Sequence, residues 1–539
     1  MTTVKHVLLA RQGQDPALLF EEGSWTFAQL VEEGRRRVAF FEAIRDPAAP
    51  PHIGVLLENT PEYLFWLSAA GLSGSVVVGV NSTYRGEQLA QLITYTDCQI
   101  IIASSDMVGL LDGLDLGPAT DRVFVVDSES YRSRMDATPA QPEADLPEVS
   151  EEDLFLLIFT SGSTGAPKAV RCTQGRFTRT GMHVAGVTDI APGRDVVYAS
   201  LPLFHSSSLF TGWASALHAG VPLAIRRRFS ASGTLPDIRR FGATVMTYTG
   251  KVLNYILAVP EAPDDLDNPL RLAIGNEASQ RDIVDTARRL GCEVRDSYGS
   301  TEGIIIIRRD ASMPAGALGR AADTVKVLDP DTGAECPPAA FDDRGVVINF
   351  TEAVGEIVET APNSVFEGYY RNEEASRARF RGGAYWSGDL AYRDDDGWFY
   401  FAGRSSEWLR VDGENFAAAP VEAIISRFPP IRSVAVYAVP DDPVGDRVMA
   451  AIEWRHGERV DPAALDEFLA DQPDLGPKWV PQFVRFVPEL PKLASMKIDK
   501  LRLRREAWTA DGVWWRPQRN ADLVPVTEGD RRSLGHLLR

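Results

Sequence analysis

The sequence predicts an α/β fold with a large, multilayered N-terminal domain and a smaller α+β C-terminal domain. Three observations support this prediction. Apolar strand-like runs alternate with helical segments over Ile53–Ser105, and the same rhythm resumes after Leu154. Short β runs with turn signals then fill Gly316–Phe401, and a further set of helix and strand signals follows Gly403. Alternation of this kind is typical of largely parallel sheets covered by helices on both faces.

The first α/β segment reads as strand, helix, strand, helix and strand. The expected elements are Ile53–Asn59, Thr60–Gly74, Ser75–Asn81, Arg85–Asp97 and Cys98–Ser104. The strand runs are short and rich in apolar residues, whereas the helical runs are longer and carry apolar residues at helical spacing. We therefore expect a buried, largely parallel sheet here.

The later elements follow an exposed connection over Ala137–Asp153, which is rich in proline and acidic residues. Further expected strands are Asp195–Leu201, Val221–Arg226, Thr244–Tyr248 and Leu272–Gly275. In the C-terminal part, the expected helices are Ala418–Arg427 and Pro462–Asp471, and the expected strands are Ile431–Val439 and Val448–Glu453. No internal repeat or low-complexity segment interrupts this order.

Charge and composition exclude several classes of function. The 539 residues include 44% hydrophobic and 24% charged residues, the balance of a soluble globular protein. Lys and Arg number 56 against 75 Asp and Glu, which gives a net charge of −19 and disfavours nonspecific binding to nucleic acid. The four cysteines are widely separated and lack metal-ligand spacing, which indicates a reducing cytosol and no structural zinc site.

Apolar stretches do not predict a membrane span. Val7–Ala10 is far too short for a signal peptide. The longest uncharged stretch, Phe65–Val80, is interrupted by glycines and reads as a buried helix that runs into a buried strand. The basic, tryptophan-containing tail Lys497–Arg519 suits a membrane surface or packing onto its own domain, and we favour packing. We expect a cytoplasmic protein with at most peripheral membrane contact.

The most informative motif is LLIFTSGSTGAPKAV, residues Leu156–Val170. A strand-like run ends at Thr160, and small residues and hydroxyl side chains fill the space before Lys168. Glycines let main-chain N–H groups approach an anion, and the hydroxyls and the lysine add donors and charge. This is the chemistry of a phosphate-binding loop, although its spacing differs from that of P-loop NTPases.

This string resembles the signature of the adenylate-forming superfamily, which includes acyl-CoA synthetases, peptide-synthetase adenylation domains and beetle luciferase. Three more blocks occur in the expected order: DSYGSTEG (Asp296–Gly303), YWSGDLAYRDDDGWFYFAGR (Tyr385–Arg404) and LPKLASMKIDK (Leu490–Lys500). The resemblance extends over nearly the whole chain.

A closer resemblance is to very-long-chain acyl-CoA synthetases and fatty-acid transport proteins, a branch that includes bacterial ligases for steroid side-chain acids. It is carried by LPLFHSSS (Leu201–Ser208), RRRFSAS (Arg226–Ser232), LAIGNEAS (Leu272–Ser279) and LRVDGEN (Leu409–Asn415). The N-terminal membrane segment of the animal transport proteins is not found in this sequence, which argues against a transport role.

The resemblance implies a nucleotide site with ATP and Mg²⁺ as cofactors. The residues expected to hold the β- and γ-phosphates are Thr160, Ser161, Gly162, Ser163, Thr164, Gly165 and Lys168. Glu302 would bind Mg²⁺, Thr301 would contact the α-phosphate, and Tyr298 would stack on adenine. The base pocket would be lined by Gly275, Asn276, Glu277, Asp296, Ser297 and Gly299. Asp389 would bind the ribose hydroxyls, and Arg404 would contact ribose or phosphate.

The C-terminal block implies that Lys497 drives adenylation, although Met496 stands where glycine is usual and Lys492 and Lys500 lie close by. The implied domains are residues 1–404, with a β-rich subdomain over 316–401, and a mobile C-terminal domain over 407–539. Ser406 lies at the expected hinge, 405–406, where Asp or Lys is usual. Gly413 would line the tunnel for the pantetheine of coenzyme A.

The acid site follows from the same resemblance. His205 would orient the substrate carboxylate, with a buried structural histidine as the alternative. The acyl pocket would be built from Ser206–Phe210, Thr247–Lys251, Gly275 and Gly299–Ile304, which include Ser206, Phe210, Thr249, Gly250 and Gly303. Several of these residues are small, which leaves room for a bulky acid.

The leading hypothesis is an ATP-dependent acyl-CoA synthetase, an AMP-forming acid–thiol ligase, for a hydrophobic carboxylic acid. Long-chain fatty, steroid side-chain and diterpenoid acids all suit such a pocket. Two alternatives stay open: an acyl-AMP ligase that loads the phosphopantetheine of a carrier protein, and a lipid-binding or uptake protein with a degenerate nucleotide site. A homodimer is common among the relatives and is neither required nor excluded by the sequence.

Overall fold

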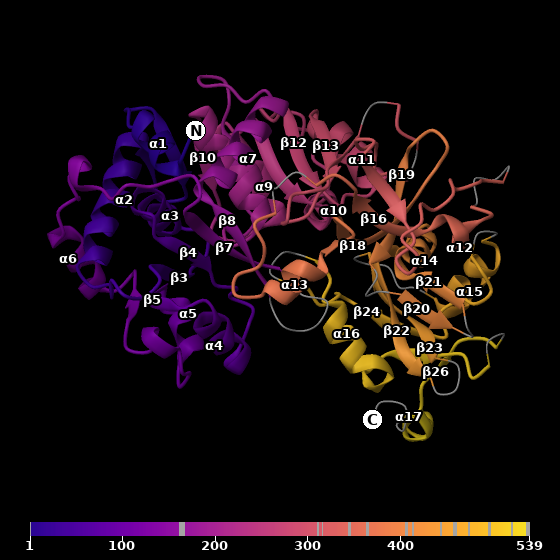
Figure 1. Ribbon diagram of the computed structural model, residues 1–539. Coiled ribbons are helices and arrows are strands. Elements are labelled where there is room, and N and C mark those ends of the chain that lie inside the picture. Colours follow the sequence, from indigo (N-terminus) through magenta and orange to yellow (C-terminus); the bar gives the residue numbers. More distant parts are fainter. Residues whose placement is uncertain are drawn as a thin grey trace. The chain divides into compact units, whose positions relative to one another are not determined.

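The computed structural model contains two compact units (Figure 1). The first comprises Met1–Ile306 and Asn363–Ala378, and the second comprises Ile307–Pro362 and Arg379–Arg539. The structure describes residues 2–160, 168–309, 312–314, 316–342, 347–362, 366–404, 408–411, 414–441, 445–455, 461–472, 475–493, 497–518 and 521–534.

One sheet of the first unit has the strand order β6-β5-β3-β4-β7-β8. Its strands are β3 (His52–Leu56), β4 (Val76–Gly79), β5 (Cys98–Ala103), β6 (Val123–Val125), β7 (Leu154–Thr160) and β8 (Lys168–Thr173). All neighbours are parallel except β7 and β8, which form an antiparallel pair. Strands β3, β4 and β5 are buried at every position, which is why each reads as a continuous apolar run rather than as an alternating one.

A second sheet of this unit follows the order β13-β12-β11-β9-β10-β1-β2. Its strands are β1 (Pro16–Phe20), β2 (Gly23–Thr26), β9 (Val197–Ala199), β10 (Leu223–Ile225), β11 (Val245–Thr249), β12 (Leu272–Asn276) and β13 (Glu293–Tyr298). Only β2 runs antiparallel to its neighbour. The carboxyl ends of β11, β12 and β13 therefore lie at one edge of the sheet.

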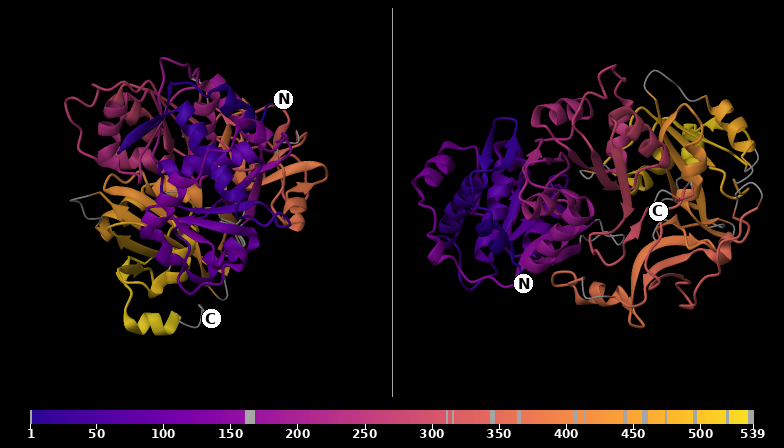
Figure 2. Two further views of the ribbon diagram at one scale, coloured as in Figure 1. Left: turned by 90° about the vertical axis from the view of Figure 1, so that its left-hand side faces the viewer. Right: turned by 90° about the horizontal axis from the view of Figure 1, so that it is seen from above.

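Helices alternate with these strands along the chain, as the views in Figure 2 show in indigo to magenta. The helices are α1 (Val4–Ala10), α2 (Phe27–Glu42), α3 (Pro61–Ser73), α4 (Gly86–Tyr95), α5 (Ser105–Val108), α6 (Glu129–Ala137), α7 (Gln174–Val187), α8 (Ser215–Ala219), α9 (Ala231–Phe241), α10 (Gly250–Ala258), α11 (Gln280–Leu290) and α13 (Glu373–Ala378). A π-helix, η4 (Ser207–Ala214), precedes α8. Helix α2 starts at a capping box formed by Thr26 and Gln29, and α3 ends at Gly74 in the left-handed conformation.

The second unit contains an antiparallel sheet in the order β15-β16-β18-β17, with β19 paired to β18. Its strands are β15 (Val325–Leu328), β16 (Gly355–Glu359), β17 (Phe380–Arg381), β18 (Ala384–Arg393) and β19 (Phe399–Arg404). The short strand β14 (Ile307–Arg308) and helix α12 (Phe350–Ala353) belong to the same unit. The predicted run of short strands and turns thus forms a sheet.

A larger sheet of the second unit follows the order β21-β20-β23-β24-β25-β26, with β22 paired to β23. Its strands are β20 (Trp408–Val411), β21 (Glu414–Ala417), β22 (Ile431–Asp441), β23 (Gly445–Trp454), β24 (Phe483–Val487), β25 (Val513–Trp515) and β26 (Val524–Pro525). The helices of this part are α14 (Ala418–Ile425), α15 (Pro462–Ala470), α16 (Lys500–Glu506) and α17 (Glu528–Leu534).

The tryptophans of the C-terminal tail pack inside their own unit. Trp508 is fully buried and stacks on Phe483 with ring centres 5.1 Å apart, and Trp515 stacks on the other side at 5.9 Å. Trp514 packs against a second apolar cluster of the same unit. This packing agrees with the favoured interpretation of the tail. Within the described residues, no helix combines the length and the apolar character needed to cross a bilayer.

Candidate active site

The carboxyl ends of β11, β12 and β13 bring together most of the residues predicted for the base pocket. Thr249 lies opposite Asn276, and Gly275 lies opposite Asp296 in the parallel ladders. Ligands of open α/β sheets bind at this end of the strands. A Cβ atom on Gly275 would lie 2.2 Å from the Tyr248 carbonyl oxygen, so only glycine allows this close approach.

Asp296 holds the loop that follows β12. Its Oδ2 atom accepts hydrogen bonds from the Tyr248 hydroxyl and from the Ala278 main-chain N–H, both at 2.9 Å, and only 5% of the residue is exposed. Between these anchors, Glu277 adopts a φ of +65° and is exposed. Asp296 therefore holds the loop over Gly275–Ala278 through its hydrogen bond to Ala278. Tyr298, the last residue of β13, is half-buried.

The predicted phosphate loop connects the two strands of an antiparallel hairpin. Thr160 ends β7, Lys168 begins β8, and the two residues are paired across the ladder. Five predicted residues of this loop (Ser161, Gly162, Ser163, Thr164 and Gly165) lie outside the described residues. The structure nonetheless fixes where the loop starts and ends.

Glu302 lies in the turn after β13 and is held from two directions. The Tyr369 hydroxyl donates to Glu302 Oε1 at 2.8 Å, and the two residues are 4% and 6% exposed. The guanidinium of Arg176, on α7, donates to the main-chain carbonyls of Thr301 and Glu302, the latter at 3.0 Å. Both the carboxylate and the main chain of Glu302 are therefore fixed by buried partners.

The predicted acid site lies next to this turn. Ser206 Oγ and Thr301 Oγ1 are hydrogen-bonded at 3.0 Å, which joins the start of η4 to the Glu302 turn. His205 Nδ1 lies 3.0 Å from Ser207 Oγ, and its ring is half-buried rather than enclosed in the core. Phe210, on η4, lies 5.6 Å from the Arg176 guanidinium. A π-helix widens the helical turn, a feature often found at functional sites.

The other predicted acyl-pocket residues lie on the same edge or turn. Thr249 is buried at the end of β11, Gly250 begins α10, and Gly303 follows Glu302 with a φ of +74°.

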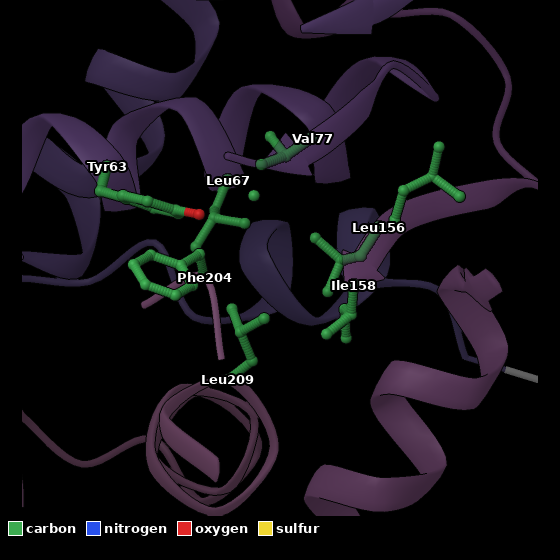
Figure 3. Close-up of a pocket in the computed structure, with 9 residues that line it drawn as sticks. Tyr63, Leu67, Val77, Leu156, Ile158, Phe204 and Leu209 are labelled. Carbon is green, nitrogen blue, oxygen red and sulfur yellow. The ribbon is translucent and has the colours of Figure 1, made fainter. Parts of the chain in front are cut away.

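The core that includes Phe204, the residue before His205, is tightly packed. Figure 3 shows a gap among Tyr63, Leu67, Phe204 and Leu209, together with residues of β4 and β7. The gap leaves no room for a water molecule. Phe204 can line this gap because Gly79 has no side chain. A Cβ atom on Gly79 would lie only 2.8 Å from the Cβ atom of Phe204. This gap is therefore a packing feature of the core.

Asp389 and Arg404, in the second unit, are cross-strand neighbours on β18 and β19. The β18 backbone at Asp389 is held by two main-chain donors: Gly388 N–H donates to Glu356 Oε1 at 2.6 Å, and Asp389 N–H donates to Ser387 Oγ at 3.1 Å. Burial raises the pKa of Glu356. The structure thus brings Asp389, predicted to bind the ribose, next to Arg404, predicted to contact ribose or phosphate.

Lys497, in the second unit, pairs with the chain segment that precedes it. Its carbonyl accepts from Leu493 N–H at 2.8 Å, and Lys492 pairs with Ile498. The flanking lysines form ion pairs, Lys492 with Glu489 at 2.5 Å and Lys500 with Glu422 at 3.0 Å. Ser406, Gly413 and Met496 lie outside the described residues.

The donor chemistry of the Glu302 turn fits Mg²⁺ bound together with a nucleotide. Within the described residues, no three His, Cys, Asp or Glu side chains cluster as a metal cage. Mg²⁺ in nucleotide sites is held by one or two carboxylates plus phosphate oxygens and water, and does not need such a cage. A single buried carboxylate with one oxygen already hydrogen-bonded meets this requirement.

Two residues of this site were not singled out by the sequence analysis. Tyr369 and Arg176 contact Glu302 from positions 67 and 126 residues away in the chain. Neither residue lies in a chemically distinctive sequence motif. Contacts between residues so far apart in the sequence could be identified only from the folded structure. The only hint was the aromatic pair in FEGYYRN, Phe366–Asn372, which sequence reasoning left unused.

Comparisons with known sequences cover nearly the whole chain. The sequence model of a family described as AMP-binding enzyme matches residues 6–370, and that of the AMP-binding enzyme C-terminal domain matches residues 420–497. A steroid-22-oyl-CoA synthetase of Rhodococcus jostii is 46% identical over 513 residues, which covers 95% of this chain and 92% of the relative. A medium/long-chain-fatty-acid–CoA ligase of Mycobacterium marinum is 44% identical and covers 93% of this chain and 94% of the relative.

Solved structures share the fold at low sequence identity. An anthranilate CoA ligase in complex with anthranoyl-AMP has a TM-score of 0.78 at 21% identity, and the match covers 94% of this chain and 97% of that chain. ATP-bound MatB from Rhodopseudomonas palustris has a TM-score of 0.79 at 22% identity and covers 93% and 98%. The predicted α/β fold with a large N-terminal and a smaller C-terminal part is confirmed.

Proposed function

Because the chain belongs to the AMP-binding enzyme family of the adenylate-forming superfamily, we propose that it joins a bulky hydrophobic carboxylic acid to coenzyme A at the expense of ATP. The family resemblance predicted from the sequence motifs is confirmed by these matches. The observation that carries the proposal is the convergence, in one unit, of the Glu302 turn, the phosphate-loop hairpin and the strand ends that carry Gly275 and Asp296.

The proposed reaction has two balanced halves. In the first, a carboxylate oxygen of the acid attacks the α-phosphorus of ATP, the bond to the β-phosphate oxygen breaks, and pyrophosphate leaves. In the second, the coenzyme A sulfur attacks the acyl carbon, the thiol proton is lost to solvent, and AMP leaves. Both halves depend mainly on positioning and on neutralising phosphate charge.

The residues of the first unit would supply most of that positioning. Lys168 and Thr160 would contact the terminal phosphates, Thr301 the α-phosphate, and the strand ends at Gly275 and Asn276 the adenine. Mg²⁺, when bound, neutralises charge on the phosphate oxygens. Glu302 would present its carboxylate to that ion, and His205 would orient the acid.

The acid is proposed to be a steroid side-chain acid or a fatty acid of medium to long chain. The two relatives with 46% and 44% identity carry these two names, and each covers more than nine-tenths of this chain. A diterpenoid acid fits the same apolar chemistry. Small side chains at Ser206, Gly250 and Gly303 would leave the room that a polycyclic acid needs.

In the second unit, Lys497 is proposed to stabilise the charge that develops between the carboxylate and the α-phosphate. Asp389 and Arg404 would bind the ribose. Ser406 is proposed as the hinge between residues 1–404 and a mobile domain over 407–539, and Gly413 as part of the coenzyme A tunnel. These four assignments follow from the family's motifs.

The test is release of AMP and pyrophosphate with Mg-ATP across a panel of fatty, steroid side-chain and diterpenoid acids, with and without coenzyme A. We expect coenzyme-A-dependent AMP formation with one class of acid. Lys497→Ala should lower adenylate formation about 100-fold, because one charge-stabilising donor is lost. Thioester formation from the chemically prepared acyl-adenylate should be largely unchanged in this variant.

Lys492→Ala and Lys500→Ala are the matched controls, because each removes a nearby lysine of the same chain segment. A loss carried by either of them, rather than by Lys497→Ala, would move the catalytic assignment. Pyrophosphate exchange without turnover by coenzyme A would instead favour a carrier protein as acceptor. Binding of the acid with no ATP consumption would favour the lipid-binding alternative.

A further inference from the structure

Tyr369 lies in a segment that returns to the first unit beside the phosphate-loop hairpin. Residues 366–371, here called the strap, run antiparallel to β8: Arg171 N–H donates to the Gly368 carbonyl at 3.1 Å, and Tyr370 N–H donates to the Ala169 carbonyl at 2.8 Å. Glu367 also accepts from Thr173 N–H and Oγ1, at 2.8 and 2.6 Å. The strap is therefore fixed to the strand that begins at Lys168.

The side chain of Tyr369 contacts two elements that belong to the proposed nucleotide site. Its hydroxyl donates to Glu302 Oε1 at 2.8 Å, and Lys168 Nζ lies 5.5 Å from the centre of its ring. An ammonium at this distance from an aromatic face is attracted to it. Phe366 packs edge-on against the same ring at 5.1 Å, which limits how the ring can turn. One side chain thus links the phosphate lysine to the metal-binding carboxylate.

A carboxylate has two oxygens, and the tyrosine bond distinguishes them. Oε1 is occupied by a neutral donor in a buried setting, where such a bond is strong and holds the rotamer. Oε2 is then the oxygen that an ion would meet. Arg176 fixes the main chain of Glu302 at the same time. The hydrogen bond from Tyr369 therefore restricts the remaining freedom of Glu302, which is rotation of its side chain.

We infer that Tyr369 is a positioning residue for Glu302. The Tyr369 hydroxyl orients the Glu302 carboxylate toward Mg²⁺, and the Tyr369 ring holds Lys168 beside the phosphates. The inference rests on the proposed function, because it requires that Glu302 bind the Mg²⁺ of Mg-ATP. Hydrogen-bond partners of metal ligands commonly change metal affinity by about 10- to 100-fold when they are removed.

The strap contains its own control. Tyr370, the next residue, also donates its hydroxyl to a carboxylate at 2.8 Å, but that carboxylate is Asp97, which has no assigned role in the reaction. Tyr369→Phe and Tyr370→Phe therefore each delete one hydrogen bond from a tyrosine hydroxyl of the strap to a carboxylate. Only the Tyr369→Phe deletion affects Glu302. Tyr369→Leu additionally removes the ring next to Lys168.

The experiment is equilibrium binding of ATP to the full chain by calorimetry, with and without Mg²⁺, supported by Mg²⁺ titration at fixed ATP. We expect Tyr369→Phe to raise the half-saturating Mg²⁺ concentration about tenfold, and to leave binding of metal-free ATP unchanged. Tyr370→Phe should change neither. Tyr369→Leu should also weaken binding of metal-free ATP, because Lys168 loses its support.

Two results would overturn the inference. If Tyr369→Phe leaves the Mg²⁺ requirement unchanged, or shifts it no more than Tyr370→Phe does, the tyrosine is structural only. If its effect persists in full when Glu302 is already replaced by Gln, the hydroxyl does not act through Glu302. Failure of the nucleotide part of the proposed function is distinguishable: if the wild-type chain itself shows no Mg-ATP binding, the inference falls with it.

Discussion

Glu302 and Asp389, two carboxylates proposed to bind the Mg²⁺ and the ribose of Mg-ATP, are presented in different ways by the two units. The carboxylate of Glu302 is buried and accepts a hydrogen bond from Tyr369. Asp389 is half-buried within β18, where the main-chain N–H groups of Gly388 and Asp389 donate to Glu356 and Ser387. In the first case, packing selects a side-chain rotamer. In the second, main-chain hydrogen bonds fix the backbone that carries the carboxylate.

This difference suggests that the two carboxylates have different tasks. A metal ligand must keep a fixed distance to the phosphates while charge moves, so a locked carboxylate suits it. A ribose diol offers two hydroxyl donors that adjust to an acceptor, so a correctly placed strand backbone is sufficient. The comparison can be tested by substitutions that change one feature of each residue.

The largest contrast is expected from the isosteric pair Glu302→Gln and Asp389→Asn, since both remove one charge and preserve shape. Glu302→Gln should lower kcat for adenylate formation about 100-fold, because a charge-stabilising contact of the transition state is lost. Asp389→Asn should raise KM for ATP about tenfold with a smaller change in kcat, because a hydrogen bond to a charged group is weakened. Steady-state pyrophosphate release at varied ATP and Mg²⁺ measures both.

The outcome that contradicts this contrast is a shared kinetic signature. If Asp389→Asn shifts the Mg²⁺ requirement as strongly as Glu302→Gln does, then Asp389 contributes to the metal site. If Glu302→Gln changes only KM for ATP, its carboxylate acts as an ordinary binding group.

A second contrast concerns two glycines that border these sites. In Gly275→Ala, the new Cβ atom would lie 2.2 Å from the Tyr248 carbonyl oxygen. This oxygen belongs to the main chain of the neighbouring strand, so it cannot move away as the end of a flexible side chain can. In Gly388→Ala, the nearest atom is Arg379 Nη1 at 2.6 Å, at the end of a flexible side chain, although the φ of +76° is itself strained for alanine. We expect Gly275→Ala to destabilise the chain by about 1–3 kcal/mol, and Gly388→Ala by roughly 1–2 kcal/mol.

Thermal unfolding of both variants, together with KM for ATP, measures this contrast. Gly242→Ala is a useful reference, because its φ is +63° and no atom lies within 4 Å of the new Cβ. A destabilisation of Gly275→Ala no larger than that of this reference would mean that the strand ends can relax, and that the edge is less rigid than the contacts imply.

The sequence predicted the local parts of this architecture well. The strand expected over Thr244–Tyr248 is β11, and the helix expected over Ala418–Arg427 is α14, which ends at Ile425. The helix ends early because Arg427 N–H bonds to the Ile424 carbonyl, a tightened last turn ahead of Pro429 and Pro430.

The sequence could not predict contacts that depend on long-range register. Asp389 and Arg404 became neighbours only once the β18–β19 pairing was known. The hydrogen bond from Tyr369 to Glu302 joins residues on separate elements, and no periodicity or motif encodes it. The motif residues of the site were therefore predictable as a set, whereas the residues that hold them in place were not.

The smallest expected effect concerns Glu356, the acid that accepts a hydrogen bond from the Gly388 N–H beside Asp389. Burial raises the pKa of Glu356 above its value in the unfolded chain, despite the Gly388 N–H and Arg381 beside it. A raised pKa means that the folded chain binds the proton more tightly, so the contribution of Glu356 to stability is present at acid pH and is lost as the pH rises through the raised pKa. Glu356→Gln cannot titrate. The difference in unfolding temperature between wild type and this variant should therefore shift in favour of the variant between about pH 4 and about pH 7. A difference that stays constant over this range would mean that Arg381 and the Gly388 N–H fully compensate the buried charge of Glu356.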